Sequence, residues 1–437
     1  MIWNTLTYTG WGRVHRATAQ VARPERISSL AAIQADTGAP AIGMCRSYGD
    51  SCLNDGGHAI DMTRVDRLLG FDTENGVLEV EAGARIGDIA RRFAPDGWLP
   101  SVMPGTGFAT VGGCIAHDVH GKNHHGAGSF GQHVVEISLM SGGKLQKISP
   151  SKNVKLFRAT IGGMGQTGAI VAAKLQLLPC KGDIMTVTER RIENLDHFLE
   201  ALDNSKSTYT VGWVDATAKG EALGRGILEE AETGYGLVPD AKRSRAVPFN
   251  APGWALSNPM VRLFNAAYLR RVPERGRTSV KPITEFFFPL DKLLEWNRLY
   301  GKRGFHQFQC VVPVSEAAVL RVMLDQIGNA GLASPLAVLK RMGAGRAGLM
   351  SFPMEGYTLA IDFPNRAGVE PLIAELEEIT KNAGGRVYLA KDATLDPSHL
   401  MKMYPDLHKF AKLISEIDPD GMYETDQTRR LNIRSHA

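Results

Sequence analysis

The chain has 437 residues, 43% of them hydrophobic, which is enough for about three units of roughly 150 residues with packed cores. Its 50 basic and 46 acidic residues leave a formal charge of only +4, which argues against a dedicated nucleic-acid binder. No cationic and apolar leader opens the chain and no apolar run reaches about 18 residues, so we expect a soluble protein without a transmembrane helix. Five cysteines without a C-x-x-C pair fit a reduced, cytoplasmic setting.

The first part of the chain contains three glycine-rich segments that are predicted to be loops. The first, residues 41–50, precedes a strand-like run at 58–62, and a helix is predicted over Ile86–Phe93 from its apolar spacing. The second loop spans 104–116 and continues into the cationic run 120–125, and the third spans 157–171 and ends in a β-type run. Glycine has no Cβ, so backbone amides in such loops can approach an anionic ligand closely. Together the loops indicate one extended ligand that carries a diphosphate.

The usual nucleotide-binding patterns do not account for these loops. G-x-x-x-x-G-K-[ST] is absent, and Gly162 to Gly168 lacks G-x-G-x-x-G between a strand and a helix. The sequence therefore disfavours P-loop, kinase and Rossmann folds.

Glycine density falls near residues 179–182, and the pattern of predicted elements changes there. Helical spacing at 195–202 and 317–327 flanks predicted strands at Tyr209–Val214 and 307–312. After about residue 385, residues 388–392 resemble a strand end and 404–414 show helical spacing. We expect an α+β protein with a cofactor domain and a separate second domain.

Residues 242–277 are predicted to be irregular and mix aromatic and aliphatic side chains with eight basic ones: Lys242, Arg243, Arg245, Arg262, Arg270, Arg271, Arg275 and Arg277. Such a mixture suits contact with an anionic lipid surface. A surface loop with a packed underside fits the same pattern.

Several motifs in this order resemble the FAD-binding oxidases of the vanillyl-alcohol oxidase superfamily and, within it, the family of decaprenylphosphoryl-β-D-ribose 2′-oxidases. They are Arg46-Ser47-Tyr48-Gly49-Asp50, Pro104-Gly105-Thr106, Thr110-Val111-Gly112-Gly113, His120-Gly121-Lys122-Asn123-His124-His125, Gly162-Gly163-Met164-Gly165, Tyr388-Leu389-Ala390-Lys391-Asp392 and Arg429-Arg430-Leu431. The resemblance extends over nearly the whole chain. It implies a two-domain FAD-binding fold of the PCMH or VAO type, with the substrate domain built on an antiparallel sheet.

The resemblance also implies domain limits and site residues. The FAD-binding domain would span 1–182, the substrate-binding domain 183–385, and residues 386–437 would return to the FAD-binding domain. The implied catalytic residues are Lys391, His120, Lys122 and Tyr48. The implied FAD-binding residues are Gly43, Arg46, Ser47, Tyr48, Gly49, Gly105, Thr106, Thr110, Val111, Gly112, Gly113, His120, Gly121, Asn123, Gly128, Ser129, Gly168, Ile170 and Tyr388. The implied substrate-binding residues are Trp213, Gln307, Gln309, Lys340 and Lys391.

The residue types suit flavin chemistry. Reduction places negative charge on the flavin, which a cation such as Lys122 or Lys391 can stabilise. His120, His124 and His125 do not form a set with an established metal-ligand spacing, so no metal is expected. Gln309 fits either a substrate contact or a hydrogen bond inside the core. Where the resembling family has a cysteine near its active site, this chain has Ala360.

Three functions remain open from the sequence. The first is FAD-dependent oxidation of the 2′-hydroxyl of a polyprenyl-phosphoryl ribose to a 2′-keto sugar, which a partner NAD(P)H reductase of the short-chain type would return as the arabinose epimer for cell-envelope glycans. The second is a soluble alditol or aldonolactone oxidase, and the third is a non-catalytic flavin or sugar-phosphate binding module. The first implies a cytoplasmic protein that also contacts the inner face of the membrane peripherally.

We predict that FAD is held without a covalent bond. Covalent relatives carry a histidine in the first glycine loop, whereas this chain has Tyr48 there. Acid precipitation of the purified protein should leave the yellow colour in the supernatant. Flavin fluorescence that stays with the denatured band on a gel would contradict the prediction.

Overall fold

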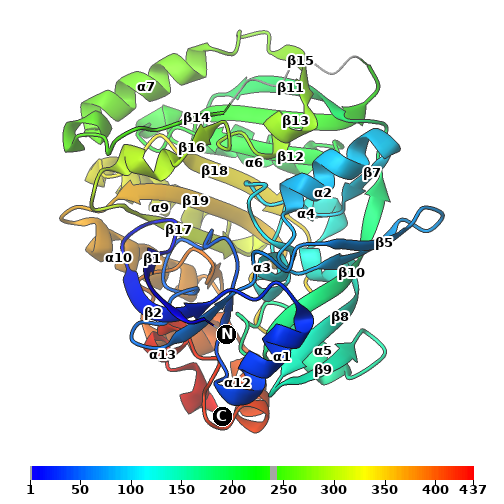
Figure 1. Cartoon of the computed structure of the whole chain (residues 1–437). Helices are drawn as coiled ribbons and strands as arrows, with labels where there is room; N and C mark the ends of the chain where they lie inside the picture. The colour runs from blue at the N-terminus through cyan, green and yellow to red at the C-terminus, as the bar shows by residue number, and fades with distance from the viewer. Residues whose placement is uncertain (1, 237–243) are drawn as a thin grey trace.

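Three main sheets form the frame of the molecule, and the computed structural model describes residues 2–236 and 244–437 (Figure 1). The first sheet has the order β1-β2-β4-β3, formed by Asn4–Thr9, Arg16–Ala22, His58–Asp61 and Ala41–Ile42. The second has the order β5-β6-β10-β8-β9, formed by Leu68–Asp72, Val77–Glu81, Ala169–Pro179, Val134–Ser141 and Lys144–Ile148, and β7 (Trp98–Pro100) also pairs with β10.

The third sheet is antiparallel throughout and has the order β15-β11-β13-β12-β18-β19-β17-β20. Its strands are Arg277–Pro282, Ile184–Ile192, Gly226–Gly234, Tyr209–Val214, Ala337–Met342, Gly356–Pro364, Phe305–Val312 and Arg386–Val387. A short parallel pair, β14 (Arg245–Ala246) and β16 (Leu293–Leu294), lies apart from it. This arrangement confirms the expected α+β fold with an antiparallel second sheet.

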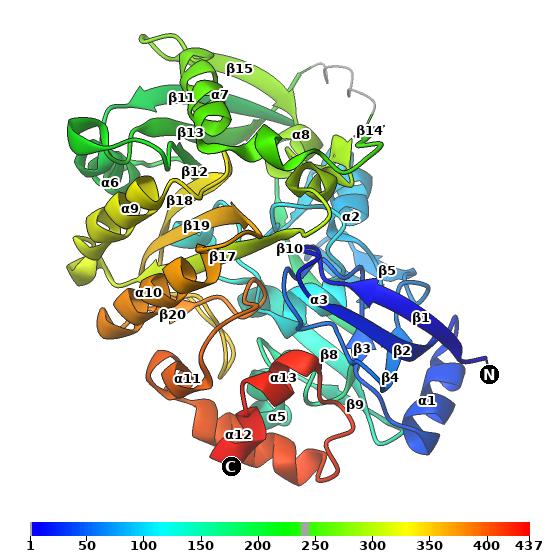
Figure 2. The same cartoon turned by 90° about the vertical axis from the view of Figure 1, so that its left-hand side faces the viewer.

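Helices α1 to α5 belong to the first part of the chain: Ile27–Asp36, Ile86–Phe93, Val111–Ala116, His124–Ala127 and Val154–Thr160. Helices α6 to α10 follow or separate strands of the third sheet: Leu195–Asn204, Asn258–Arg270, Ile283–Phe287, Val319–Ala330 and Val369–Asn382. The last three, α11 to α13, are Pro397–Met403, Leu407–Ile417 and Asp426–Arg430. Figure 2 shows α6, α9 and α10 on one side of the third sheet, and α11 to α13 at the lower end of the molecule.

Strand β17 shows why the third sheet forms a wall of the site. All eight of its residues are buried, and side chains alternate between the two faces. Phe308, Cys310 and Val312 belong to the core formed with α9 and α10, whereas Gln307 and Gln309 line a cavity on the opposite face. The alternation therefore places amide groups and a packed core on the two faces of one strand.

The neighbouring strands extend this wall. Gln309 of β17 lies opposite Ala360 of β19, and Lys340 of β18 lies opposite Thr358 of β19. Because residues opposite one another share a face, all four side chains reach the same cavity. The antiparallel register thus assembles polar groups that are far apart in sequence.

Local sequence patterns predicted several elements correctly. The helix over Ile86–Phe93 and the strand over Tyr209–Val214 have the expected limits. The helices expected at 195–202, 317–327 and 404–414 are α6, α9 and α12, the last two displaced by a few residues. The chain passes from β10 to β11 at residues 180–183, and we propose the domain limit 182/183 on that basis. The last strand of the third sheet, β20, ends at Val387, two residues beyond the proposed limit 385/386.

The prediction that residues 242–277 are irregular was wrong, because they contain the 13-residue helix α7. Its buried side is narrow and partly polar: Val261 and Asn265 are each 1% exposed, and the Asn265 amide donates to the Asp215 carboxylate at 2.7 Å. A helix whose buried stripe contains asparagine and whose exposed side includes Leu263 and Phe264 does not show the usual amphipathic pattern. Lys242 and Arg243 lie outside the described residues.

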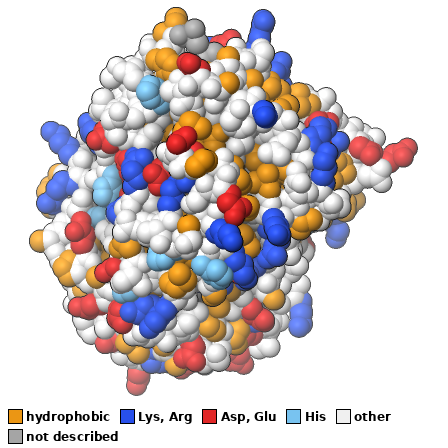
Figure 3. Space-filling model, turned by 90° about the horizontal axis from the view of Figure 1, so that it is seen from below, with side chains coloured by type: hydrophobic (Ala, Val, Ile, Leu, Met, Phe, Trp, Pro, Cys, Tyr) orange, Lys and Arg blue, Asp and Glu red, His pale blue; other side chains and the backbone are white. Residues whose placement is uncertain are grey.

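The face seen from below carries both basic and acidic side chains, scattered among hydrophobic ones (Figure 3). Among the described residues, no helix is long and apolar enough to cross a membrane.

Candidate active site

A cavity of about 860 Å³ lies where the three sheets meet. Its walls come from the first glycine loop, the loop before α3, the residues that follow α3, and strands β12, β17, β18 and β19. The predicted site residues that line it are Gly43, Arg46, Ser47, Tyr48, Gly105, Thr106, Thr110, Gly112, Gly113, His120, Gly121, Lys122, Gly168, Ile170, Trp213, Gln307, Gln309, Lys340, Tyr388 and Lys391. Segments from both ends of the chain therefore converge on one space.

Five predicted FAD-binding residues lie behind the wall instead: Gly49, Val111, Asn123, Gly128 and Ser129. The Asn123 amide donates to the Ser101 carbonyl at 2.8 Å, and the Ser129 hydroxyl donates to Asp118 at 2.9 Å. These side chains support the loops that form the wall.

The first glycine loop fits a diphosphate. The backbone N–H groups of residues 44 to 47 have no hydrogen-bond partner within the described part of the chain. Gly43 packs so closely on the α3 N-cap that a Cβ would lie 2.5 Å from Thr110 Oγ1, whereas a Cβ on Gly105 would meet nothing within 4 Å. The loop thus presents free donors beside an open, glycine-lined space, as an anionic cofactor requires.

The start of α3 contributes shape rather than amide donors. The N–H groups of Val111 and Gly112 donate to the carbonyls of Ala84 and Ala82, and that of Gly113 donates to Thr110 Oγ1. Glycine at 112 is needed for close packing, because a Cβ would lie 3.1 Å from the Ala82 side chain.

Arg46 is a cation of the first glycine loop. Its guanidinium lies 4.0 Å from the Trp11 ring and 4.8 Å from the Phe108 ring, and its buried Nε has no protein partner among the described residues. A buried donor without a partner costs free energy, so the position favours an anionic ligand. These residues fit FAD.

A carboxylate from the second domain fixes the loop at 104–107. Asp291 accepts a hydrogen bond from the Thr106 hydroxyl at 2.8 Å and another from the Gly107 N–H at 2.7 Å. The motif Phe288-Pro289-Leu290-Asp291 therefore helps to hold the cofactor domain's own loop.

Lys391 lies at the centre of the site. Its Nζ is 3.5 Å from the centre of the Tyr48 ring, and the Tyr48 N–H donates to the Ala390 carbonyl at 3.0 Å. Burial lowers the pKa of Lys391, while Asp362 opposes that shift. The Asp362 carboxylate accepts hydrogen bonds from the Gln307 amide and from the Tyr300 hydroxyl. Lys391 therefore loses its proton more readily than an exposed lysine.

His120 joins two predicted substrate-binding residues. Its Nδ1 lies 3.1 Å from Lys340 Nζ, and its Nε2 lies 2.9 Å from the Gln309 amide. Burial lowers the pKa of Lys340 to about 7 and that of His120 well below its usual range. The Gln309 amide nitrogen can only donate, so the neutral ring accepts at Nε2 and donates from Nδ1 to the Lys340 amine in its neutral form.

Lys122 lines the same cavity but points to a different wall. Its Nζ donates to the Phe286 carbonyl and lies 3.8 Å from the Phe286 ring. Burial lowers its pKa to about 8, and Glu229 opposes the shift. His124 and His125 hydrogen-bond to backbone groups of Gly343 and Ser207, and within the described ranges no group of three metal-binding side chains forms.

Sequence reasoning missed several residues of the wall. Trp11 and Phe108 hold Arg46, but their approach to it depends on the tertiary fold. His117 lines the cavity, lies 3.4 Å from the Ser47 hydroxyl, and has its pKa lowered to about 4 by burial. In the sequence, only its position three residues before His120 could have indicated that His117 belongs to the site.

Comparison with known proteins agrees with this geometry. Residues 16–149 match an FAD binding domain, and residues 360–431 match a D-arabinono-1,4-lactone oxidase domain. The chain is 33% identical over 446 residues to the decaprenylphosphoryl-β-D-ribose oxidase of Mycolicibacterium smegmatis, with 97% of each chain covered. It is 22% identical to the L-gulono-1,4-lactone dehydrogenase of Mycobacterium tuberculosis, over 95% of this chain and 96% of that protein. It is 24% identical to the L-gulonolactone oxidase of Mus musculus, over 87% of each.

The fold and the cavity, with these matches, define an FAD-dependent oxidoreductase with an FAD-binding domain of the PCMH type. Glycine loops, a buried arginine and cationic side chains meet in one cavity, as such an enzyme requires. The chain belongs to the family of the decaprenylphosphoryl-β-D-ribose oxidases, within the vanillyl-alcohol oxidase superfamily.

The buried amine of Lys340 should make stability depend on pH. Its pKa is about 7 in the folded protein and about 10.5 when unfolded, so the unfolded state binds more protons between these values. The unfolding free energy should rise between about pH 7 and about pH 10, by a few kcal/mol at most from this group, and the rise should be smaller in Lys340→Met, in which Lys122 and Lys391 still have lowered pKa values. Chemical denaturation across this range would measure it, with the exposed Lys412→Met as the matched control. Parallel pH curves for wild type and Lys340→Met would contradict it.

Proposed function

We propose that this enzyme oxidises the 2′-hydroxyl of a polyprenyl-phosphoryl-β-D-ribose to the 2′-keto sugar. The observation that carries the proposal is the joint presence of Lys391, Lys340 and Lys122 in one cavity of a chain that matches such an oxidase over 97% of its length. Both the cofactor and this substrate are anionic, so cations that are poorly solvated in the free protein gain partners when both bind.

The side chains of the cavity suggest separate roles. FAD, when bound, accepts hydride from the alcohol carbon. Lys391 Nζ, whose lowered pKa makes its neutral form accessible, can accept the proton of the 2′-hydroxyl, and the resulting ammonium would stabilise the negative charge of the reduced flavin. Lys340, Gln309 and Trp213 are proposed to orient the sugar and its phosphate from the wall of the third sheet.

Removing the Lys391 amine should slow turnover without unfolding the protein. Loss of one preorganised electrostatic group typically costs about 10²–10³ in kcat. We therefore expect Lys391→Ala to retain FAD and a cooperative melting transition but to lose about that much activity. Stopped-flow measurement of flavin reduction would show it, and Lys412→Ala on the exposed side of α12 serves as a control. Near-normal reduction by Lys391→Ala would remove the residue from the mechanism.

Anaerobic bleaching of the flavin tests the substrate class. We expect loss of the oxidised flavin absorbance with a polyprenyl-phosphoryl ribose and no loss with xylitol or gulonolactone. The match of residues 360–431 to a lactone oxidase domain makes the lactone the informative competitor. Bleaching by gulonolactone alone would assign the enzyme to the soluble sugar oxidases, and no bleaching by any of the three would favour a binding module.

A 2′-keto sugar is a carbonyl product that a hydride donor can reduce from the opposite face. We therefore infer a partner NAD(P)H-dependent reductase, which would complete an epimerisation to the arabinose form. This inference rests on the chemistry of the product.

The surface around α7 supports a peripheral membrane contact. We define the α7 surface by its exposed apolar residues Phe249, Trp254, Met260, Leu263 and Phe264, which are 41–70% exposed. Leu293 and Leu294 are also exposed and line the cavity, so the cavity opens near this surface. Such a position suits a substrate whose polyprenyl tail stays in the bilayer.

The basic residues of this segment do not all face outward. Arg271 and Arg277 pair with the fully buried Glu189 at 2.7 and 2.6 Å, so they fasten α7 and β15 to β11. Arg262, Arg270 and Arg275 are exposed and remain free to meet lipid phosphates.

Vesicle binding should depend on those three exposed arginines. Each contributes about 1 kcal/mol at an anionic surface, so changing Arg262, Arg270 and Arg275 to Ser should weaken binding about a hundredfold. Sedimentation with vesicles of phosphatidylcholine and phosphatidylserine would measure this, and higher salt should weaken wild-type binding. The matched control changes the exposed Arg26, Lys155 and Lys412 to Ser. Equal binding by the two variants would assign the α7 surface to another use.

A further inference from the structure

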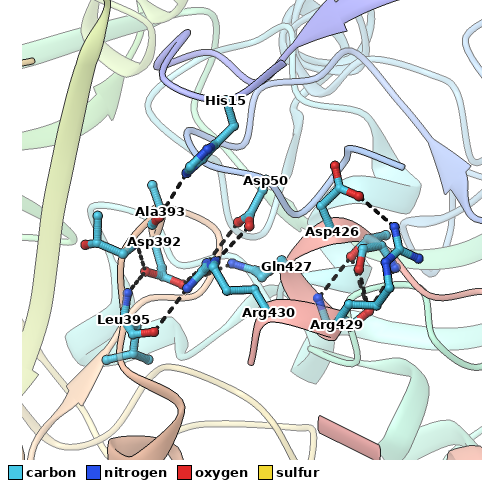
Figure 4. Close-up of polar contacts among 12 residues, drawn as sticks. His15, Asp50, Asp392, Ala393, Leu395, Asp426, Gln427, Arg429 and Arg430 are labelled. Carbon is cyan, nitrogen blue, oxygen red and sulfur yellow. Dashed lines mark hydrogen bonds and ion pairs between the residues drawn. The ribbon is translucent and has the colours of Figure 1, made fainter. Parts of the chain in front are cut away.

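The loop that carries Lys391 and the first glycine loop are tied together by a residue near the end of the chain. We propose that Arg430, on α13, is a positioning residue that holds the Lys391 loop against the first glycine loop and so fixes Lys391 relative to the cofactor (Figure 4). The proposal rests on the proposed function of Lys391. No sequence pattern had assigned a role to Arg430.

Arg430 binds the first glycine loop through the Asp50 carboxylate. Its Nε donates to Asp50 Oδ2 at 2.8 Å and its Nη2 donates to Asp50 Oδ1 at 2.9 Å. This is a bidentate ion pair, in which the planar guanidinium donates to both carboxylate oxygens. The Asp50 side chain is only 5% exposed, so the pair is largely shielded from solvent. The contact fixes both the distance and the orientation of the loop end.

The same guanidinium binds the Lys391 loop through Asp392, the residue after Lys391. Nη2 also donates to Asp392 Oδ2 at 2.7 Å, and Nη1 donates to the Leu395 carbonyl at 3.1 Å. Asp392 Oδ1 in turn accepts from the N–H groups of Thr394 and Leu395, at 2.8 and 2.7 Å. Asp392 therefore stabilises the turn that follows it, and Arg430 binds the other oxygen of the same carboxylate.

The two loops also touch directly. A Cβ on Gly49 would lie 1.8 Å from the Asp392 carbonyl oxygen, so only glycine permits this approach. The Tyr48 N–H donates to Ala390, and the Gln427 amide of α13 donates to the Leu389 carbonyl at 2.7 Å. This close packing explains why Gly49 lies behind the cavity wall. It also leaves little room for the Arg430 guanidinium to shift to another position.

A lysine at position 430 cannot make this set of contacts. Arginine presents five donors in a rigid fork, whereas a lysine ammonium is a point charge on a flexible stem. The neighbouring Arg429 offers a contrast on the same short helix, because it bonds Asp426 and Asn54 and its side chain is 42% exposed. Arg429→Gln is therefore a matched control that removes an arginine without freeing the Lys391 loop.

The test compares Arg430→Gln, Arg430→Lys, Asp50→Asn and Arg429→Gln in the full-length, FAD-loaded enzyme. For Arg430→Gln we expect kcat to fall by at least about tenfold while KM changes by less than about twofold, because the sugar-facing residues lie on other elements. The visible absorption and circular dichroism of the bound flavin should change, and FAD should dissociate more easily. Arg430→Lys should restore part of kcat, and Arg429→Gln should match wild type.

A double-mutant cycle separates positioning from simple loss of stability. If Arg430 acts through Asp50, the double variant Asp50→Asn with Arg430→Gln should lose about as much kcat as one single variant. Where Arg430→Gln does not fold, Asp50→Asn and Arg430→Lys carry the comparison. Wild-type kcat and flavin spectra in folded variants, or additive losses, would overturn the proposal.

Failure of the proposed function gives a different result. Normal turnover by Lys391→Ala would show that Lys391 has no role in the reaction. The flavin spectra and the FAD dissociation of the Arg430 variants are measured without substrate, so they test the positioning role independently of the proposed reaction. Unchanged spectra and dissociation with a required Lys391 would overturn the positioning role alone.

Discussion

Positive charge buried beside an anionic cofactor site is the constraint that shapes this protein. Lys340 and Lys391 lie in a cavity where burial lowers their pKa, and Asp362 opposes that shift for Lys391. A fold that keeps amines in such a place needs ligands that carry negative charge, because poorly solvated cations without partners are costly. The glycine loop with its free N–H groups and the unpartnered Nε of Arg46 point to the same class of ligand.

The third sheet meets this constraint by using both of its faces. Strand β17 packs Phe308 and Cys310 against helices on one face and presents Gln307 and Gln309 to the cavity on the other. The core that stabilises the sheet therefore also fixes the polar groups of the site. A change in the core of β17 would displace the amides as well as lower stability.

Sequence reasoning succeeded where signals are local or belong to the resembling family. The spacing of Ile86, Ile89, Ala90 and Phe93 predicted α2. The resemblance implied that Lys391 is brought to the cofactor from far along the sequence, and the structure has its Nζ 3.5 Å from the centre of the Tyr48 ring. Reasoning failed where the decisive contact joins distant segments, as between Arg46 and Trp11. Helix α7 was missed because its buried stripe includes Asn265 while Leu263 and Phe264 face outward.

The bond between Arg430 and Asp50 spans 380 residues of sequence. Both loops that it joins lie in or next to the cofactor site, yet its donor belongs to α13, far along the chain from the glycine loops. A chain still emerging from the ribosome has the glycine loops long before it has this arginine, and contacts of such separation form late because loop closure must come first. This part of the cofactor site therefore orders only after α13 has folded back onto the first glycine loop.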